Sequence, residues 1–279
     1  MKHLLRFTSL LILSLSGVVS AQSNAEHPIQ AAMEYAARHP TSNVAVSLWN
    51  DGLTELPPEF AQAKSIFHLD LNQNHFEQFP LVVTQLPKLT KLTLASNNLT
   101  SLPPEISDLN AITELDLSNN QLTELPPEIG QLKSLQWLNL DHNNLTSLPP
   151  EIGQLDNLTY LHVGHNQLTT LPPEIANMDN LQILWVADNQ FSTLPPIEIS
   201  AAPKLTFLNL ERNPLEDALP QGVSIWGDSS ILAYLQAQYK LAQQGRLSLL
   251  IALGSSSTLL LLGLIWRRWR RPRRKKKRA

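Results

Sequence analysis

Leucine-like residues recur along the chain with a period of 23 residues, apart from one unit of 24. In each unit an apolar residue is followed three and five positions later by two more. This alternation predicts a short strand with one buried face. Eight positions after each first apolar residue stands an asparagine. The first apolar residues are Ile66, Leu89, Ile112, Leu135, Leu158, Leu181 and Leu205, and the asparagines are Asn74, Asn97, Asn120, Asn143, Asn166, Asn189 and Asn213.

Most units continue with a Leu-Pro-Pro-Glu-Ile segment, as at 102–106 and 148–152. Proline has no N–H to donate, so this segment predicts a turn onto an outer face where no ladder hydrogen bond is lost. A buried asparagine can both donate and accept, so the asparagines are expected to satisfy backbone groups of the turns. No unit can bury its leucines alone, and stability is therefore expected from the stacking of neighbours.

The pattern Leu-x-x-Leu-x-Leu-x-x-Asn-x-Leu-x-x-Leu-Pro-x-x-Ile resembles the leucine-rich repeat of bacterial proteins. The resemblance covers residues 43–227, about eight units, with Asp51 replacing the asparagine of the first unit. It implies an α/β solenoid, a horseshoe with short parallel strands on its concave face. Apolar residues at helical spacing predict capping helices within 22–42 and 228–245.

Residues 1–21 have the pattern of a signal peptide. Lys2 and Arg6 form a positive start, an apolar stretch follows, and Val19-Ser20-Ala21 offers small residues for cleavage. We expect cleavage after Ala21. An uncleaved anchor is the alternative, although the apolar stretch is short for crossing a bilayer.

Near the other end, residues 247–266 carry no charge, and as a helix they are long enough to span a bilayer. The basic residues 267–279 follow and predict a tail held in the cytoplasm. We therefore expect a single-pass protein of the cytoplasmic (inner) membrane, with its repeats on the extracytoplasmic or periplasmic side. The alternative is a surface-sorting signal that is cut, although no Leu-Pro-x-Thr-Gly motif is present.

The formal net charge of −3 conceals a segregated distribution. All 24 Asp and Glu lie between the two ends, against nine Lys and Arg, so this middle part carries a formal charge of −15. Nucleic-acid phosphates require a positive surface, so the charge argues against a nucleic-acid partner. The chain contains no cysteine, which excludes disulfides and thiolate chemistry.

The sequence offers no motif for catalysis. It has no glycine-rich phosphate loop, no Gly-x-Ser-x-Gly and no His-Glu-x-x-His, and its glutamates recur on the outer turn as a solvated face. We expect neither enzymatic activity nor a cofactor. His142, His165 and Asp188 fall on successive units, with Asp141 and His162 nearby. Such a ladder can bind a divalent metal or make binding pH-dependent, but we read it as hydrated surface and predict no metal site.

The positions two and four residues after each unit's first apolar residue should face solvent on the strands. Neighbouring strands lie about 4.8 Å apart, so aromatic residues on successive strands should form one apolar patch. Such a patch usually marks an interface; the alternative is that the C-terminal cap covers Phe207. The predicted binding residues are Trp137, Tyr160, His162, Ile183, Trp185 and Phe207.

These features predict a membrane-anchored, extracytoplasmic module that binds a protein, peptide or glycan, while the repeat itself does not identify the ligand. Two alternatives stay open. One is a surface adhesin released from its C-terminal helix. The other is a receptor that signals only through a partner, because residues 267–279 are too few for an effector domain.

Overall fold

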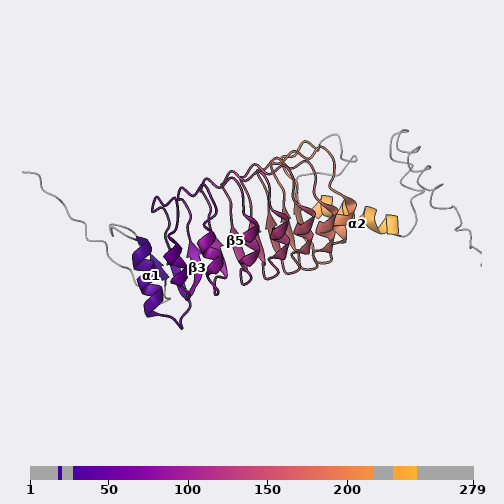
Figure 1. The fold of residues 1–279 in the computed structure, drawn as a ribbon. Coiled ribbons are helices and arrows are strands. Elements are labelled where there is room, and N and C mark those ends of the chain that lie inside the picture. The colour runs from indigo at the N-terminus through magenta and orange to yellow at the C-terminus, as the bar shows by residue number, and fades with distance from the viewer. Residues whose placement is uncertain (1–17, 21–27, 216–228, 244–279) are drawn as a thin grey trace, which may run out of the picture.

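The computed structural model describes residues 18–20, 28–215 and 229–243. Within them each unit contributes one short parallel strand and most contribute one 3-10 helix, and the units stack in sequence order (Figure 1). The predicted leucine-rich-repeat solenoid is therefore confirmed. The repeat strands are β2 (Val44–Ser47), β3 (Ile66–Asp70), β4 (Lys91–Thr93), β5 (Glu114–Asp116), β6 (Trp137–Asn139), β7 (Tyr160–His162), β8 (Ile183–Trp185) and β9 (Phe207–Asn209).

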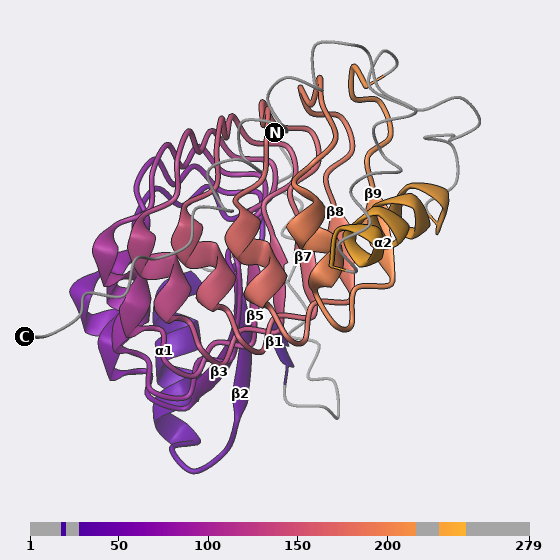
Figure 2. The same ribbon diagram turned by 90° about the vertical axis from the view of Figure 1, so that its right-hand side faces the viewer.

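The Leu-Pro-Pro-Glu-Ile segments fold into 3-10 helices on the side opposite the strands. The second proline begins five of the seven described helices, where its missing N–H leaves no bond unmade. Figure 2 shows strands and 3-10 helices as two rows along the stack. The helices are η1 (Pro58–Gln62), η2 (Leu81–Gln85), η3 (Pro104–Asp108), η4 (Pro127–Gln131), η5 (Pro150–Gln154), η6 (Pro173–Asn177) and η7 (Ile197–Ala201).

One continuous apolar core runs between the two rows, formed by the repeated leucines and one large apolar residue of each 3-10 helix, which is usually isoleucine but is Phe60 in η1 and Val83 in η2. The asparagines border this core as predicted. Asn143, for example, donates from Nδ2 to the carbonyl oxygens of Leu117 and Leu140, both at 3.0 Å. Its Oδ1 accepts from the N–H of Leu122 at 3.0 Å. Each asparagine thus joins its own turn to the preceding unit.

Two α-helices flank the stack. α1 (Pro28–Arg38) contacts η1 and buries Ala32 and Ala36. α2 (Ser229–Gln243) contacts η7 and β9, and it adds Ile231, Leu232 and Leu235 to the core. These helices lie within the segments expected to form the N-terminal and C-terminal caps.

The sequence did not predict strand β1 (Val18–Ser20), which pairs in parallel with β2. β1 lies inside the predicted signal peptide, so cleavage after Ala21 would remove it and leave β2 at the sheet edge. The predicted span 247–266 and tail 267–279 lie outside the described residues. Among the residues that are described, no helix is both long and apolar enough to cross a membrane.

Candidate functional site

The outward side chains of β2–β9 form one surface, which we call the strand face. Its columns follow from the strand register, which pairs Glu114 with Trp137, Trp137 with Tyr160, and Tyr160 with Ile183. The second column pairs His162 with Trp185. The predicted alignment of the columns is therefore confirmed, and all six predicted binding residues lie on neighbouring strands.

Four of these six residues bring their rings into one line, which we call the ring row. The ring centroids of Trp137 and His162 lie 6.2 Å apart. His162 and Trp185 stack at 6.0 Å, and Trp185 and Phe207 stack at 5.8 Å. These distances match ordinary aromatic contacts. The row begins in the first column with Trp137, passes through the second column with His162 and Trp185, and returns to the first column with Phe207.

Gly164 sets the position of the Trp185 indole. A Cβ added at Gly164 would lie 3.0 Å from Cδ1 of Trp185 and 3.1 Å from Oδ1 of Asp141. The Gly164 N–H donates to Oδ1 of Asp141 at 2.5 Å, while Oδ2 of Asp141 lies 3.7 Å from Nδ1 of His162. Glycine therefore lets the indole lie against the backbone, and Asp141 supports both the glycine and the histidine beside it.

Tyr160 and Ile183 complete the predicted patch without joining the ring row. Tyr160 keeps 37% of its surface exposed, and Ile183, Trp185 and Phe207 are partly exposed. Phe207 therefore remains on the surface of the described structure. The patch is apolar, lies on four adjacent strands and is open to solvent.

Directly beside the patch, the strand face contains a hollow of about 350 Å³, which we call the strand-face hollow. Trp137 and Tyr160 form one side of it, and charged residues form the other. Trp137 and Tyr160 were predicted as binding residues from the sequence, whereas the charged residues beside them were not. The lining residues are Lys91, Thr93, Glu114, Asp116, Gln136, Trp137, Thr159 and Tyr160.

The strand-face hollow contains a partly buried acid. Burial raises the pKa of the Asp116 carboxyl above its usual value, and the nearby Asp141 adds to this rise. Hydrogen bonds from the backbone N–H and the hydroxyl of Ser118, both to Oδ1, oppose it. At the hollow's edge, Lys91 forms an ion pair with Glu114 at 2.7 Å. On strand β3, burial of the His68 imidazole lowers its pKa, and the positive charge of Lys91 lowers the pKa further.

The histidine ladder proposed from the sequence lies on the turns that follow the strands. His142 and His165 stack with centroids 3.9 Å apart. Asp188 Oδ2 lies 3.3 Å from Nε2 of His165 and 2.7 Å from a guanidinium nitrogen of Arg212. The guanidinium of Arg212 therefore lies beside the Asp188 carboxylate, where a metal ion bound by the ladder would lie. Within the described part of the chain, no group of three or more His, Cys, Asp or Glu is arranged to hold a metal ion.

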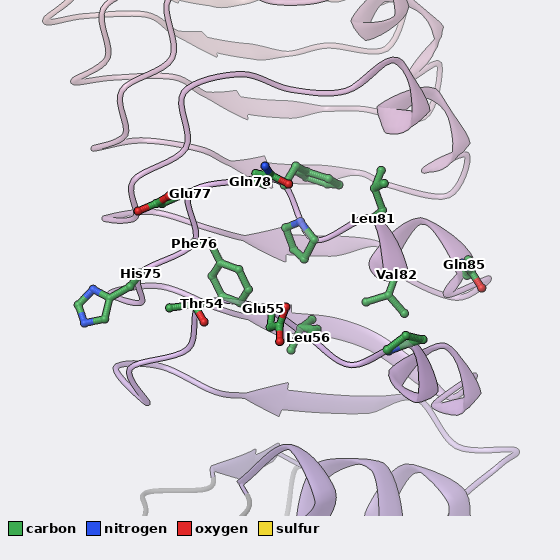
Figure 3. Close-up of a pocket in the computed structure, with 13 residues that line it drawn as sticks. Thr54, Glu55, Leu56, His75, Phe76, Glu77, Gln78, Leu81, Val82 and Gln85 are labelled. Carbon is green, nitrogen blue, oxygen red and sulfur yellow. The ribbon is translucent and has the colours of Figure 1, made fainter.

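A larger hollow, of about 660 Å³, lies away from the strand face between the first two units. Figure 3 shows Thr54–Leu56 and His75–Gln78 on successive chain segments, with Leu81 and Val82 on η2. Leu81 and Val82 replace the usual Pro-Glu, and Leu81 is 48% exposed. This departure from the repeat pattern is the sequence signal that marks the hollow. The strand face remains the stronger candidate because it combines aromatic rings with the partly buried carboxyl of Asp116.

Comparisons with known proteins agree with this architecture. The model of the leucine-rich repeat region matches residues 113–209, and the model of two leucine-rich-repeat copies matches residues 87–127. No curated protein sequence matches the chain. Among solved structures, an internalin C2 from Listeria monocytogenes is 30% identical with a TM-score of 0.53. That alignment covers 60% of this chain and 71% of the internalin.

Two further bacterial structures are similar. A second Listeria monocytogenes internalin, inlF, is 22% identical to this chain, with a TM-score of 0.52. The alignment covers 63% of this chain and 52% of the internalin. An identity this low shows a shared fold alone. A leucine-rich-repeat protein of Leptospira interrogans is 30% identical with a TM-score of 0.48; this chain aligns over 70% of its own length and spans 59% of that protein. With the repeat, the asparagine ladder and the similarity to internalin C2 established, this chain belongs to the leucine-rich-repeat family.

Proposed function

We propose that this protein is a recognition module that binds a protein or peptide partner on its strand face. Leucine-rich repeats are generally protein-binding modules and are typically not enzymes. The partner would contact the apolar patch that extends from Trp137 to Phe207. In this proposal the function is binding by the surface of strands β6 to β9, and it requires no catalytic residues.

The ring row is the observation that carries this proposal. Aromatic side chains supply much of the binding energy at protein interfaces, and exposed clusters of them are uncommon on proteins that bind nothing. The row extends over three strand spacings, about 14 Å. This length suits a short peptide segment or one edge of a folded partner.

The test is a substitution at the centre of the row. Trp185 contacts His162 on one side and Phe207 on the other, so Trp185→Ala should interrupt the row in two places. We expect captured partner to fall at least tenfold, since loss of a central aromatic residue commonly costs about 2 kcal/mol. The measurement is affinity capture by the full-length, detergent-solubilised protein, with quantitative mass spectrometry of what is retained.

Trp49→Ala is the matched control. Trp49 is also an exposed tryptophan, at 43%, but it lies beyond the end of β2 and far from the row. Capture should survive this change. A partner retained equally by the wild-type protein and the Trp185→Ala variant would contradict the proposal.

We further propose that the module acts outside the cytoplasm and is anchored by residues 247–266. The support is the uncharged 20-residue stretch, the basic block after it and the signal-like residues 1–21. A reporter fused after Ala279 should be active only in the cytoplasm. Intact-mass analysis should find residues 247–279 still present, whereas their loss would indicate a released adhesin.

A further inference from the structure

We propose that the strand-face hollow binds a lysine or arginine side chain of the partner, with the Asp116 carboxylate as its counter-charge and the rings of Trp137 and Tyr160 as its walls. This proposal rests on the function proposed above and specifies the chemistry of the ligand. The hollow adjoins Trp137, the first ring of the row. The partner would therefore present a basic residue next to an apolar surface.

The register brings the acid and the rings together. Glu114, Trp137 and Tyr160 occupy one column on β5, β6 and β7, and Asp116 lies on β5 in the neighbouring column. The volume of about 350 Å³ is in the range of pockets that enclose small ligand groups. A flat guanidinium or an ammonium can contact ring faces and a carboxylate at the same time.

The negative charge around the strand-face hollow favours a cation over a neutral group. Glu114, Asp116 and Asp141 act on this region, against the single ammonium of Lys91. Lys91 pairs with Glu114 and not with Asp116. The region therefore has an excess of negative charge that a partner's cation can neutralise.

Asp116 also retains capacity to accept hydrogen bonds. Both bonds that it receives from the described residues come from Ser118 and end on Oδ1. Within the described chain, Oδ2 accepts none. Burial makes the ionised form of this carboxyl costly, and a bound cation would offset that cost.

The test uses two probes of nearly equal shape. Nα-acetyl-arginine amide carries a guanidinium, whereas Nα-acetyl-citrulline amide carries a neutral urea group in its place. Each is titrated into the full-length protein in detergent micelles, and binding is followed by the NMR signal of the Trp137 indole N–H. We expect a saturable shift with the arginine probe that weakens as salt is added, and at least tenfold weaker binding of citrulline.

Asp116→Asn should weaken arginine binding at least tenfold. Asparagine keeps an oxygen that can accept from Ser118, so the local turn should be retained. Asp70→Asn is the matched control, because Asp70 occupies the same column two strands away on β3 and does not line the hollow. This variant should bind like the wild-type protein.

Equal binding of the two probes, or arginine binding unchanged by Asp116→Asn, would overturn the cation assignment. The absence of any Trp137 shift with arginine would do the same. Partner capture that still depends on Trp185 would then leave the proposed function standing with a different ligand chemistry. Loss of Trp185 dependence would instead defeat the proposed function itself.

Discussion

In every repeat unit after the first, the asparagine of the repeat pattern is buried and satisfies backbone groups of two units. The Asn143 side chain binds two carbonyl oxygens and one N–H that lie away from water. Neighbouring asparagines share the two carbonyls, because Leu117 also accepts from Asn120 and Leu140 also accepts from Asn166. A buried polar group left without a partner costs about 1–3 kcal/mol. The series of repeat asparagines therefore forms a continuous line of hydrogen bonds along the apolar core.

Asn143→Ala should lower the free energy of unfolding by about 1–3 kcal/mol, because it leaves the buried N–H of Leu122 without its acceptor. Urea denaturation of the full-length protein measures the change. Asn144→Ala is the control, since Asn144 is the next residue and is exposed. Equal stability of the two variants would show that the ladder contributes little.

Asp116 gives stability a distinct pH dependence. Its pKa is raised in the folded protein, so the folded state binds this proton more tightly than the unfolded state does. The favourable contribution is complete below the unfolded pKa and is lost as the pH rises through the folded pKa. At neutral pH the ionised carboxylate therefore opposes folding.

Asp116→Asn should accordingly be more stable than the wild-type protein at pH 7. The difference should shrink at about pH 3, where the carboxyl is protonated in both states. Urea denaturation of both proteins at the two pH values measures this. A variant that is less stable at pH 7 would show that the hydrogen bonds from Ser118 outweigh burial.

Sequence reasoning identified the members of the ring row but not its path. Trp185 stacks with His162 and Phe207 because Gly164 provides room beneath its indole, which requires knowledge of side-chain torsions. The strand-face hollow was also missed. Its acids and its rings lie in the same columns, but they were interpreted separately as charged surface and apolar patch.

At the scale of elements, neighbouring 3-10 helices pack closely. A Cβ added at Gly130 in η4 would overlap the backbone carbonyl of Glu151, and one added at Gly153 in η5 would overlap that of Glu174. Backbone atoms cannot move aside as a flexible side chain can. Glycine at these two positions therefore allows the close approach of η4 to η5 and of η5 to η6.

Gly130→Ala should destabilise the fold by roughly 1–3 kcal/mol, the usual cost of overpacking a tight contact. Thermal and urea denaturation measure the loss. Ser107→Ala is the control, because Ser107 holds the same repeat position in η3 and already carries a Cβ. A Gly130→Ala protein as stable as the control would mean that the stack opens without cost.

The sequence predicted the strands more completely than the turns. Alternating leucines specify which strand positions are buried, and the register of β3 to β9 follows from the repeat. The 3-10 form of the outer segment was not predicted, because prolines identify a turn without fixing its hydrogen bonds. The left-handed residue that follows each repeat strand, such as His142 at φ 57°, was also not predicted, because it is not glycine in any of the described units.

At the scale of the molecule, charge and apolar surface are separated. The part between the two ends carries a formal charge of −15, while the ring row occupies one surface of four strands. A negative surface speeds encounter with a basic partner, and this effect weakens with salt. The ring row then supplies contacts that salt does not screen. Both features fit a partner that combines basic and apolar groups.

Because every unit adds one strand spacing, the number of units determines the distance between the ring row and each end of the solenoid. Removal of residues 89–111 would join Lys88 to Ile112, and Asn120 would meet Leu71 in place of Leu94, at the equivalent carbonyl. The ring row would keep every residue and lie one strand spacing, about 4.8 Å, nearer to α1. Gain or loss of whole units therefore adjusts the reach of the molecule in fixed steps, without redesign of the surface that it carries.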